Sequence, residues 1–147
     1  MPATIMVTAY STTGKARNGK SDTTFGVSTE FGNARKSWIV PLRDATMNQA
    51  ALLAVKFGIL AVRKDDRPNL SIRTDNLYLI TVLGVKDDKW AFKPSSNKEL
   101  VKEIRNMLSW EGRLNYFSIE ADKNGEEVKK LGIDVRVVAK KRLAKAS

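Results

Sequence analysis

The stretch SIRTDNLYLI, residues 71–80, contains the change from strand to helix on which the fold assignment depends. Residues 69–73 predict a short strand, and residues 76–83 predict a short helix that ends at Gly84. Asp75 stands where the strand stops and the helix begins. A carboxylate at this place either caps the helix, which is worth about 1 kcal/mol, or belongs to a metal-binding active site. The local pattern favours the cap.

Upstream of this stretch the sequence predicts three strands. The β-rich run at residues 5–10 gives the first strand, and KARNGK at residues 15–20 gives a basic turn. Apolar and polar residues alternate at 25–31, and a Gly-Asn turn at 32–33 separates this second strand from a third at 37–42. The three strands are expected to form an antiparallel meander.

The other predicted elements are three helices and one strand. Apolar residues recur at helical spacing over residues 50–61, which predicts a long helix. A Ser-x-x-Glu capping box at residues 96–99 starts a further helix that ends at residues 111–112. Residues 114–119 predict a fifth strand, and residues 135–146 predict a basic terminal helix.

Composition restricts the chemistry that the chain can perform. It has 26 Lys and Arg residues against 16 Asp and Glu, a formal net charge of +10 that favours polyanionic partners. Cysteine and histidine are both absent, which excludes thiolate nucleophiles and Ser-His-Asp triads and leaves oxygen atoms as metal ligands. The 147 residues are most economically one domain, residues 1–147. The longest apolar run is far shorter than a membrane span of ~20 residues, so we expect a cytoplasmic protein without a membrane partner.

The order of these elements, together with four local motifs, resembles the ribonuclease H family of the ribonuclease HI type. FGVSTEFG is similar to the family's second strand and turn, and ATMNQAALLA at residues 45–54 is similar to Thr-Asn-Asn-x-x-Glu-Leu-x-Ala. Thr74-Asp75-Asn76 with Tyr78 resembles Thr-Asp-Ser-x-Tyr. The segment with Trp90, Lys93, Pro94, Asn97 and Leu100 is similar to the approach to a later helix. The resemblance implies an α/β fold with a five-stranded mixed sheet, three antiparallel strands followed by two crossover strands, and helices on both faces.

Enzymes of this family hold two Mg²⁺ ions with four carboxylates. The resemblance places the first at Ala9 and the second at Ala51, so neither position carries an acid. The third matches Asp75. The fourth falls on Arg136 in GIDVRVVA, or on Asp134 if the register shifts by two residues. Two carboxylates at most would compensate a pair of divalent ions poorly, and two-metal catalysis is not expected.

Three segments carry candidate contacts to nucleic acid. The resemblance implies that Thr46 and Asn48 contact the backbone of an RNA–DNA hybrid, whereas the local alternative is two polar residues at a helix start. The terminal helix has five cations and no acid, which favours phosphate contact over a merely solvated face. The basic turn either approaches a phosphate or is a surface turn. The candidates are Lys15, Arg17, Lys20, Thr46, Asn48, Arg136 and Lys140.

These residues predict a catalytically inactive ribonuclease H-like module that binds an RNA–DNA hybrid or double-stranded RNA through its backbone, without a cofactor. One alternative is a protein-interaction or inhibitory accessory factor that docks on an acidic protein or a ribonucleoprotein. Another is a weak residual nuclease in which Asp75 binds one Mg²⁺ or Mn²⁺ ion with Asp134, Asp122 or Glu120. The sequence leaves open the preference between RNA and DNA, the oligomeric state, and whether the source is a virus or a cell.

Overall fold

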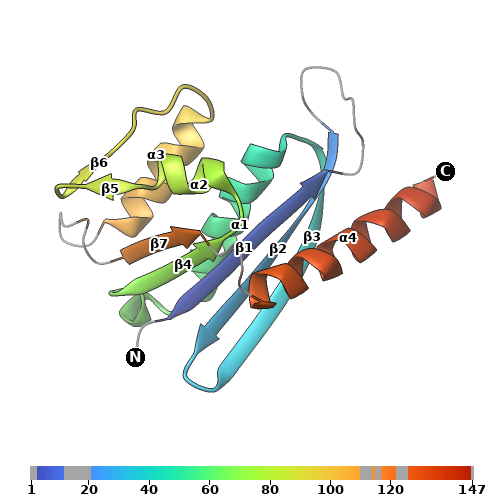
Figure 1. The fold of residues 1–147 in the computed structure, drawn as a ribbon, viewed down its shortest axis with the longest axis horizontal. Coiled ribbons are helices and arrows are strands. Elements are labelled where there is room, and N and C mark those ends of the chain that lie inside the picture. The colour runs from blue at the N-terminus through green and yellow to red at the C-terminus, as the bar shows by residue number, and fades with distance from the viewer. Residues whose placement is uncertain (1–2, 12–20, 110–113, 115–116, 122–125, 147) are drawn as a thin grey trace.

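The computed structural model describes residues 3–11, 21–109, 114, 117–121 and 126–146. Its main elements follow the order predicted from the sequence (Figure 1). The strands of the main sheet are β1 (Thr4–Ser11), β2 (Ser21–Phe31), β3 (Ala34–Ala45), β4 (Leu70–Thr74) and β7 (Phe117–Ala121). The helices are α1 (Met47–Ala61), α2 (Leu77–Val82), α3 (Lys98–Leu108) and α4 (Glu126–Ala146).

The main sheet is mixed, with the strand order β3-β2-β1-β4-β7. The first three strands pair antiparallel, and β4 and β7 join them as parallel crossover strands. Gly32 and Asn33 connect β2 to β3, and the φ of +59° at Gly32 suits the first central position of a type II′ hairpin turn. The five-stranded mixed sheet predicted from the sequence is confirmed.

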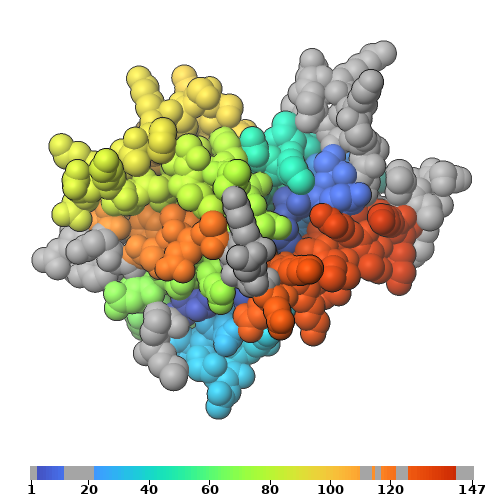
Figure 2. Space-filling view, viewed as in Figure 1, coloured from blue at the N-terminus to red at the C-terminus, as the bar shows by residue number. Residues whose placement is uncertain are grey.

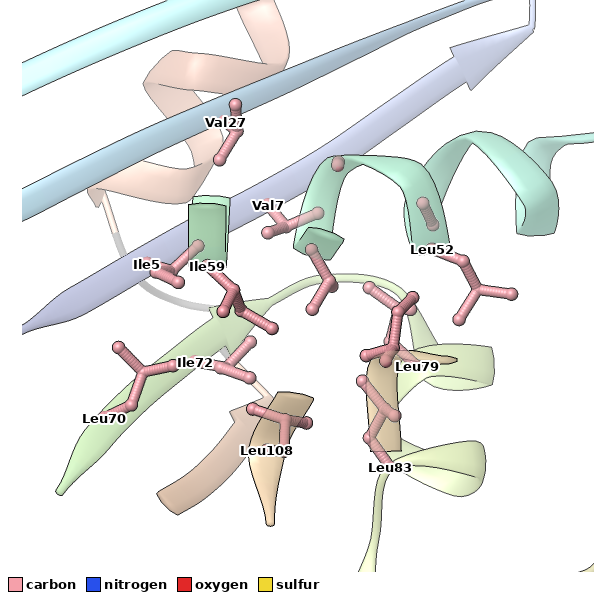
Figure 3. Packing of buried hydrophobic residues seen from close by; sticks show 14 of the residues in the cluster. Ile5, Val7, Val27, Leu52, Ile59, Leu70, Ile72, Leu79, Leu83 and Leu108 are labelled. Atoms are coloured by element: carbon pink, nitrogen blue, oxygen red, sulfur yellow. The ribbon is translucent and has the colours of Figure 1, made fainter. Parts of the chain in front are cut away.

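One face of the sheet packs against α1, and the larger part of the apolar core lies between them (Figure 3). Ile5 and Val7 of β1 are fully buried on this face, together with Leu52 and Ile59 of α1. A Cβ atom at Gly58 of α1 would lie 2.6 Å from Ile5 Cγ2, so the glycine permits this close approach. The same cluster extends to α2 and α3 through Leu79, Leu83, Ile104 and Leu108.

The opposite face of the sheet is covered by α4, which crosses β1 and β2 (Figure 1). The buried residues of α4 recur at helical spacing and are Val128, Leu131, Val135 and Ala139. Gly26 of β2 lies beneath them, where a Cβ atom would overlap with the Val135 side chain. This glycine therefore sets how closely α4 approaches the sheet.

The start of α4 differs from the prediction, because the helix begins at Glu126 and not at Val135. Its buried stripe begins at Val128 and continues past Gly132, so packing against the sheet maintains the helix through a residue of low helix propensity. None of the helices in the described part of the chain is long and apolar enough to cross a membrane.

Other predicted boundaries are also wrong, and the helix predicted to end at residues 111–112 ends at Leu108. The capping box at Ser96 does not form, because Asn97 occupies the N-cap position of α3 with a φ of +52° and without a side-chain capping bond. The last strand of the sheet begins at Phe117 and not at Leu114, in the register that places Phe117 opposite Leu70 of β4. Pairing with a neighbouring strand, which a local pattern does not contain, determines this boundary.

The sequence did not predict three short elements. They are a 3₁₀ turn at Lys64–Asp66, and the strands β5 (Val85–Lys86) and β6 (Lys89–Trp90), which form a separate hairpin. Each is too short to produce a recognisable periodicity.

Arg105 of α3 connects the β5–β6 hairpin to α2. Its guanidinium donates hydrogen bonds to the carbonyls of Val82 at 2.9 Å and Phe92 at 2.6 Å. Its Cζ also lies over the Trp90 ring, 4.8 Å from the ring centre, in a cation–π contact. Burial lowers the pKa of Arg105, and the nearby Tyr78 acts in the opposite direction. The contacts of one residue thus hold the hairpin in place.

Candidate functional site

A pocket of about 350 Å³ lies at the carboxyl ends of β1 and β4, beside the first turn of α1 and the middle of α4. Figure 2 shows this side of the molecule, with the end of β1 (blue) exposed between α1 (teal) and α4 (red). The parallel strands β1 and β4 end at the same edge of the sheet, so the residues that follow them meet there. The lining residues from β1 and α1 are Thr8, Ala9, Tyr10, Met47 and Asn48. Those from the β4–α2 turn and α4 are Asp75, Asn76, Leu77, Tyr78, Gly132 and Arg136.

Asp75 does not cap α2, so the interpretation drawn from the sequence is wrong. The helix begins at Leu77, and Asn76 takes the capping position, where its Oδ1 accepts the N–H of Leu79 at 3.1 Å. The exposed Asp75 carboxylate instead accepts a hydrogen bond from the Thr8 hydroxyl at 3.2 Å. Because Thr8 is buried in β1, this bond holds the carboxylate at the edge of the sheet.

Arg136 reaches the pocket from α4, one turn after Gly132. Its Cζ lies 5.4 Å from the centre of the Tyr10 ring, a cation–π contact with the end of β1. Asp134, the alternative in the sequence, is exposed and does not line the pocket. Two residues rotate a helix by about 200°, so the two side chains project from different faces of α4. The structure therefore places the cation, and not Asp134, at the pocket.

The two alanines that the resemblance aligns with carboxylates have different surroundings. Ala9 lines the pocket on β1, beside Tyr10. Ala51 is fully buried in the core, one turn of α1 after Met47, which lines the pocket. Ala51 therefore lies behind the wall of the pocket.

The first turn of α1 forms that wall. Thr46 is the N-cap, and its Oγ1 accepts the N–H of Gln49 at 3.0 Å, which agrees with the local alternative for this residue. Asn48 is exposed and lines the pocket, whereas Thr46 does not line it. Because the first turn contains no acid, the positive end of the helix dipole at the pocket is not neutralised by the helix itself.

Of the other predicted cations, the structure describes one, and it does not line the pocket. Lys140 is exposed on α4, one turn beyond Arg136. Lys15, Arg17 and Lys20 lie outside the described residues. Of the residues proposed from the sequence to bind nucleic acid, the structure thus brings Asn48 and Arg136 together, with Asp75 beside them.

The described groups that line the pocket are a poor match for a pair of divalent cations. Asp75 is the one acid among the described lining residues, and Arg136 adds a positive charge. Within the described ranges, no group of three or more acidic residues is arranged to hold a metal ion. Glu120 lies on β7, outside the pocket lining, and Asp122 falls outside the described residues. Hard cations need several oxygen ligands with compensating negative charge, which this set of side chains does not supply.

No protein-family model matches the sequence, and no curated protein matches it. Solved structures do match. LC11 ribonuclease H1, isolated from compost by a metagenomic approach, aligns with a TM-score of 0.69 at 17% identity, over 97% of this chain and 98% of that chain. The chain has a ribonuclease H-like fold. Ribonuclease H1 from the halophilic archaeon Halobacterium salinarum NRC-1 gives a TM-score of 0.65 at 14% identity, over 90% and 93% of the two chains. LC11 ribonuclease H1 in complex with an RNA/DNA hybrid gives a TM-score of 0.60 at 14% identity, over 88% of this chain and 92% of that chain.

Sequence reasoning assigned no role to several residues that line the pocket of this ribonuclease H-like fold. Gly132 precedes Arg136 by one helical turn, and this spacing was the available signal that both share a helix face. Asn76 follows Asp75 directly, and both residue types are good caps, so the pattern could not decide between them. The contact of Tyr10 with Arg136 joins opposite ends of the chain, for which no local signal exists.

Proposed function

We propose that this chain is a catalytically inactive ribonuclease H-like module that binds an RNA–DNA hybrid or double-stranded RNA through the nucleic-acid backbone. The observation that carries the proposal is the pocket at the ends of β1 and β4, where Arg136 lies with Asp75 and Ala9. Hydrolysis of a phosphodiester by two metal ions needs several acids at one place. Contacts to the backbone of an A-form duplex need cations, amides and hydroxyls instead.

The distribution of charge supports a polyanionic ligand. The chain has a formal net charge of +10, and α4 carries the exposed cations Arg136, Lys140 and Lys141 along and beyond the pocket. One protein of the same fold has been solved in complex with an RNA/DNA hybrid. A hybrid and double-stranded RNA present similar grooves and phosphate spacing, so both are candidate ligands.

A binding assay with short fluorescently labelled duplexes tests this proposal. Anisotropy titrations should show binding to the hybrid and to double-stranded RNA, and denaturing gels of the same samples in Mg²⁺ should show intact strands. Arg136→Glu should weaken binding to every duplex by about ten-fold or more, because a phosphate contact becomes a repulsion. Lys130→Glu makes the same change of charge at a residue outside the pocket lining, and it should weaken binding less. Absent binding, or cleavage of the hybrid in Mg²⁺, would contradict the proposal.

One observation on α4 favours a second function, docking on an acidic protein or a ribonucleoprotein. Ile133 and Val137 lie one turn apart and are 53% and 45% exposed, which places two apolar side chains on a basic helix. A pull-down tests this function. A single stoichiometric protein partner that survives nuclease treatment and is lost with Ile133→Asp would favour it over nucleic-acid binding.

The residual-nuclease alternative has weaker support, because Asp75 lines the pocket while Asp134 and Glu120 do not. Cleavage of a labelled hybrid in Mn²⁺ would establish this activity if Asp75→Asn abolished it. That result would also overturn the proposal of a catalytically inactive module.

A further inference from the structure

We infer that the pocket receives one backbone phosphate directly on the Arg136 guanidinium, so that duplex binding needs no divalent cation. The inference rests on the proposed function and adds to it the place of one phosphate and the independence from metal ions. It follows from the set of groups that line the pocket and from the way in which Arg136 is held.

The Tyr10 ring lies beside the Arg136 guanidinium. Arg136 Cζ lies over the ring, 5.4 Å from its centre, so the aromatic face attracts the cation without supplying a carboxylate. Among the described residues, no carboxylate forms an ion pair with Arg136. Edge N–H groups of a guanidinium match two oxygens of one phosphate, which is the geometry that makes such contacts specific.

The wall opposite α4 supplies neutral donors. Met47 and Asn48 occupy the first turn of α1, a helix of 15 residues with no acid in that turn, so its positive dipole end favours an anion. Asn48 is exposed and lines the pocket. Asn76 accepts the N–H of Leu79 through Oδ1, which leaves its NH₂ group as a donor. Arg136 and these amides together form a set suited to a phosphate.

Asp75 repels an anion in the pocket. The direction in which its replacement changes the affinity for a duplex therefore tests the inference. Its carboxylate lines the same pocket and is held by the Thr8 hydroxyl at 3.2 Å. If a phosphate binds on Arg136 without a metal ion, removing the charge of Asp75 relieves a repulsion and strengthens binding. If a divalent cation connected the protein to the phosphate, the same change would remove a ligand and weaken binding.

The experiment measures hybrid binding by fluorescence anisotropy in EDTA and in Mg²⁺ at equal ionic strength. Wild-type binding should be no tighter in Mg²⁺ than in EDTA, because no ion is required and Mg²⁺ competes for the phosphates. Arg136→Gln should weaken binding about ten-fold, and more than Lys130→Gln, which removes the same charge outside the pocket. Asp75→Asn should strengthen binding in both buffers, and more than Asp134→Asn. Tyr10→Leu, which removes the ring, should weaken binding more than Tyr10→Phe, which keeps the ring. Circular dichroism of each variant checks folding.

The possible failures can be told apart. Tighter binding in Mg²⁺ that Asp75→Asn abolishes would overturn the inference and leave the proposed function in place. If Arg136→Gln weakened binding no more than Lys130→Gln did, the inference would also be overturned and the proposed function would remain. Absence of wild-type binding in both buffers would overturn the proposed function itself, and the inference with it.

Discussion

Thr46 orients one wall of the pocket through a single hydrogen bond. Its Oγ1 accepts the N–H of Gln49 at 3.0 Å and closes the first turn of α1, which carries Met47 and Asn48 into the pocket lining. The side chain acts on the site by fixing a helix end. Its effect on stability can therefore be separated from any contact with a ligand.

We expect Thr46→Ala to lower the free energy of unfolding by about 1 kcal/mol, because an N–H at the helix start loses its partner. Thr46→Ser keeps the hydroxyl and should stay close to the wild type. Urea denaturation of the three proteins measures the difference. Equal stability of the alanine variant and the wild type would show that the cap contributes nothing.

At the scale of elements, α4 and β2 fit together because glycine occupies the crossing point. Gly26 lies under Leu131 and Val135, and any side chain there would push the helix outward. Gly132 of α4 is in a different situation, since among the described residues a Cβ atom would meet Thr8 Oγ1 alone, at 3.9 Å. The position of α4 matters for function because Arg136 projects from it.

Alanine at these two glycines should have opposite effects. Gly26→Ala should destabilise the protein by about 1–3 kcal/mol through overpacking against α4. Gly132→Ala should stabilise it by about 1 kcal/mol, because alanine favours the helix and meets ordinary contact distances. Thermal or urea unfolding of both variants measures whether each change lowers or raises the stability. A Gly26→Ala protein as stable as the wild type would show that α4 does not need this close approach.

Strands and helices were predictable where a long periodic pattern is present. The meander, α1 and α3 have such patterns, and their order was sufficient to predict the sheet. The beginning of α4 was missed because Gly132 interrupts the local pattern, whereas burial of Val128 and Leu131 against the sheet maintains the helix. Boundaries set by tertiary packing cannot be read from neighbours in the sequence.

The candidate site was predictable only in part. Asn48, Asp75 and Arg136 were selected through the family resemblance, and the structure brings all three to one pocket. The cation–π contact of Arg136 with Tyr10 was not predictable, because it depends on how α4 crosses the end of β1. The cap was assigned to Asp75 because its position differs from that of Asn76 by one residue, which is within the usual uncertainty of helix ends.

At the scale of the whole molecule, a ribonuclease H-like fold is combined with an excess of positive charge. The formal net charge is +10, and α4 places exposed cations beside the pocket at the sheet edge. Cations that contact phosphates displace counterions from the duplex, so affinity depends on the number of contacts and on salt. This dependence distinguishes a backbone-binding surface from a surface that binds through apolar contacts.

The most direct test of the central claim is the salt dependence of hybrid binding, measured by anisotropy in EDTA. We predict that the logarithm of the association constant falls linearly with the logarithm of the salt concentration, with a slope of about −3 or steeper, which corresponds to about three or more phosphate contacts. Arg136→Gln removes about one phosphate contact and should make this slope shallower by about 1. Binding that does not change with salt, or no binding to hybrid, RNA or DNA duplexes, would contradict the claim that this fold is used as a backbone-binding module.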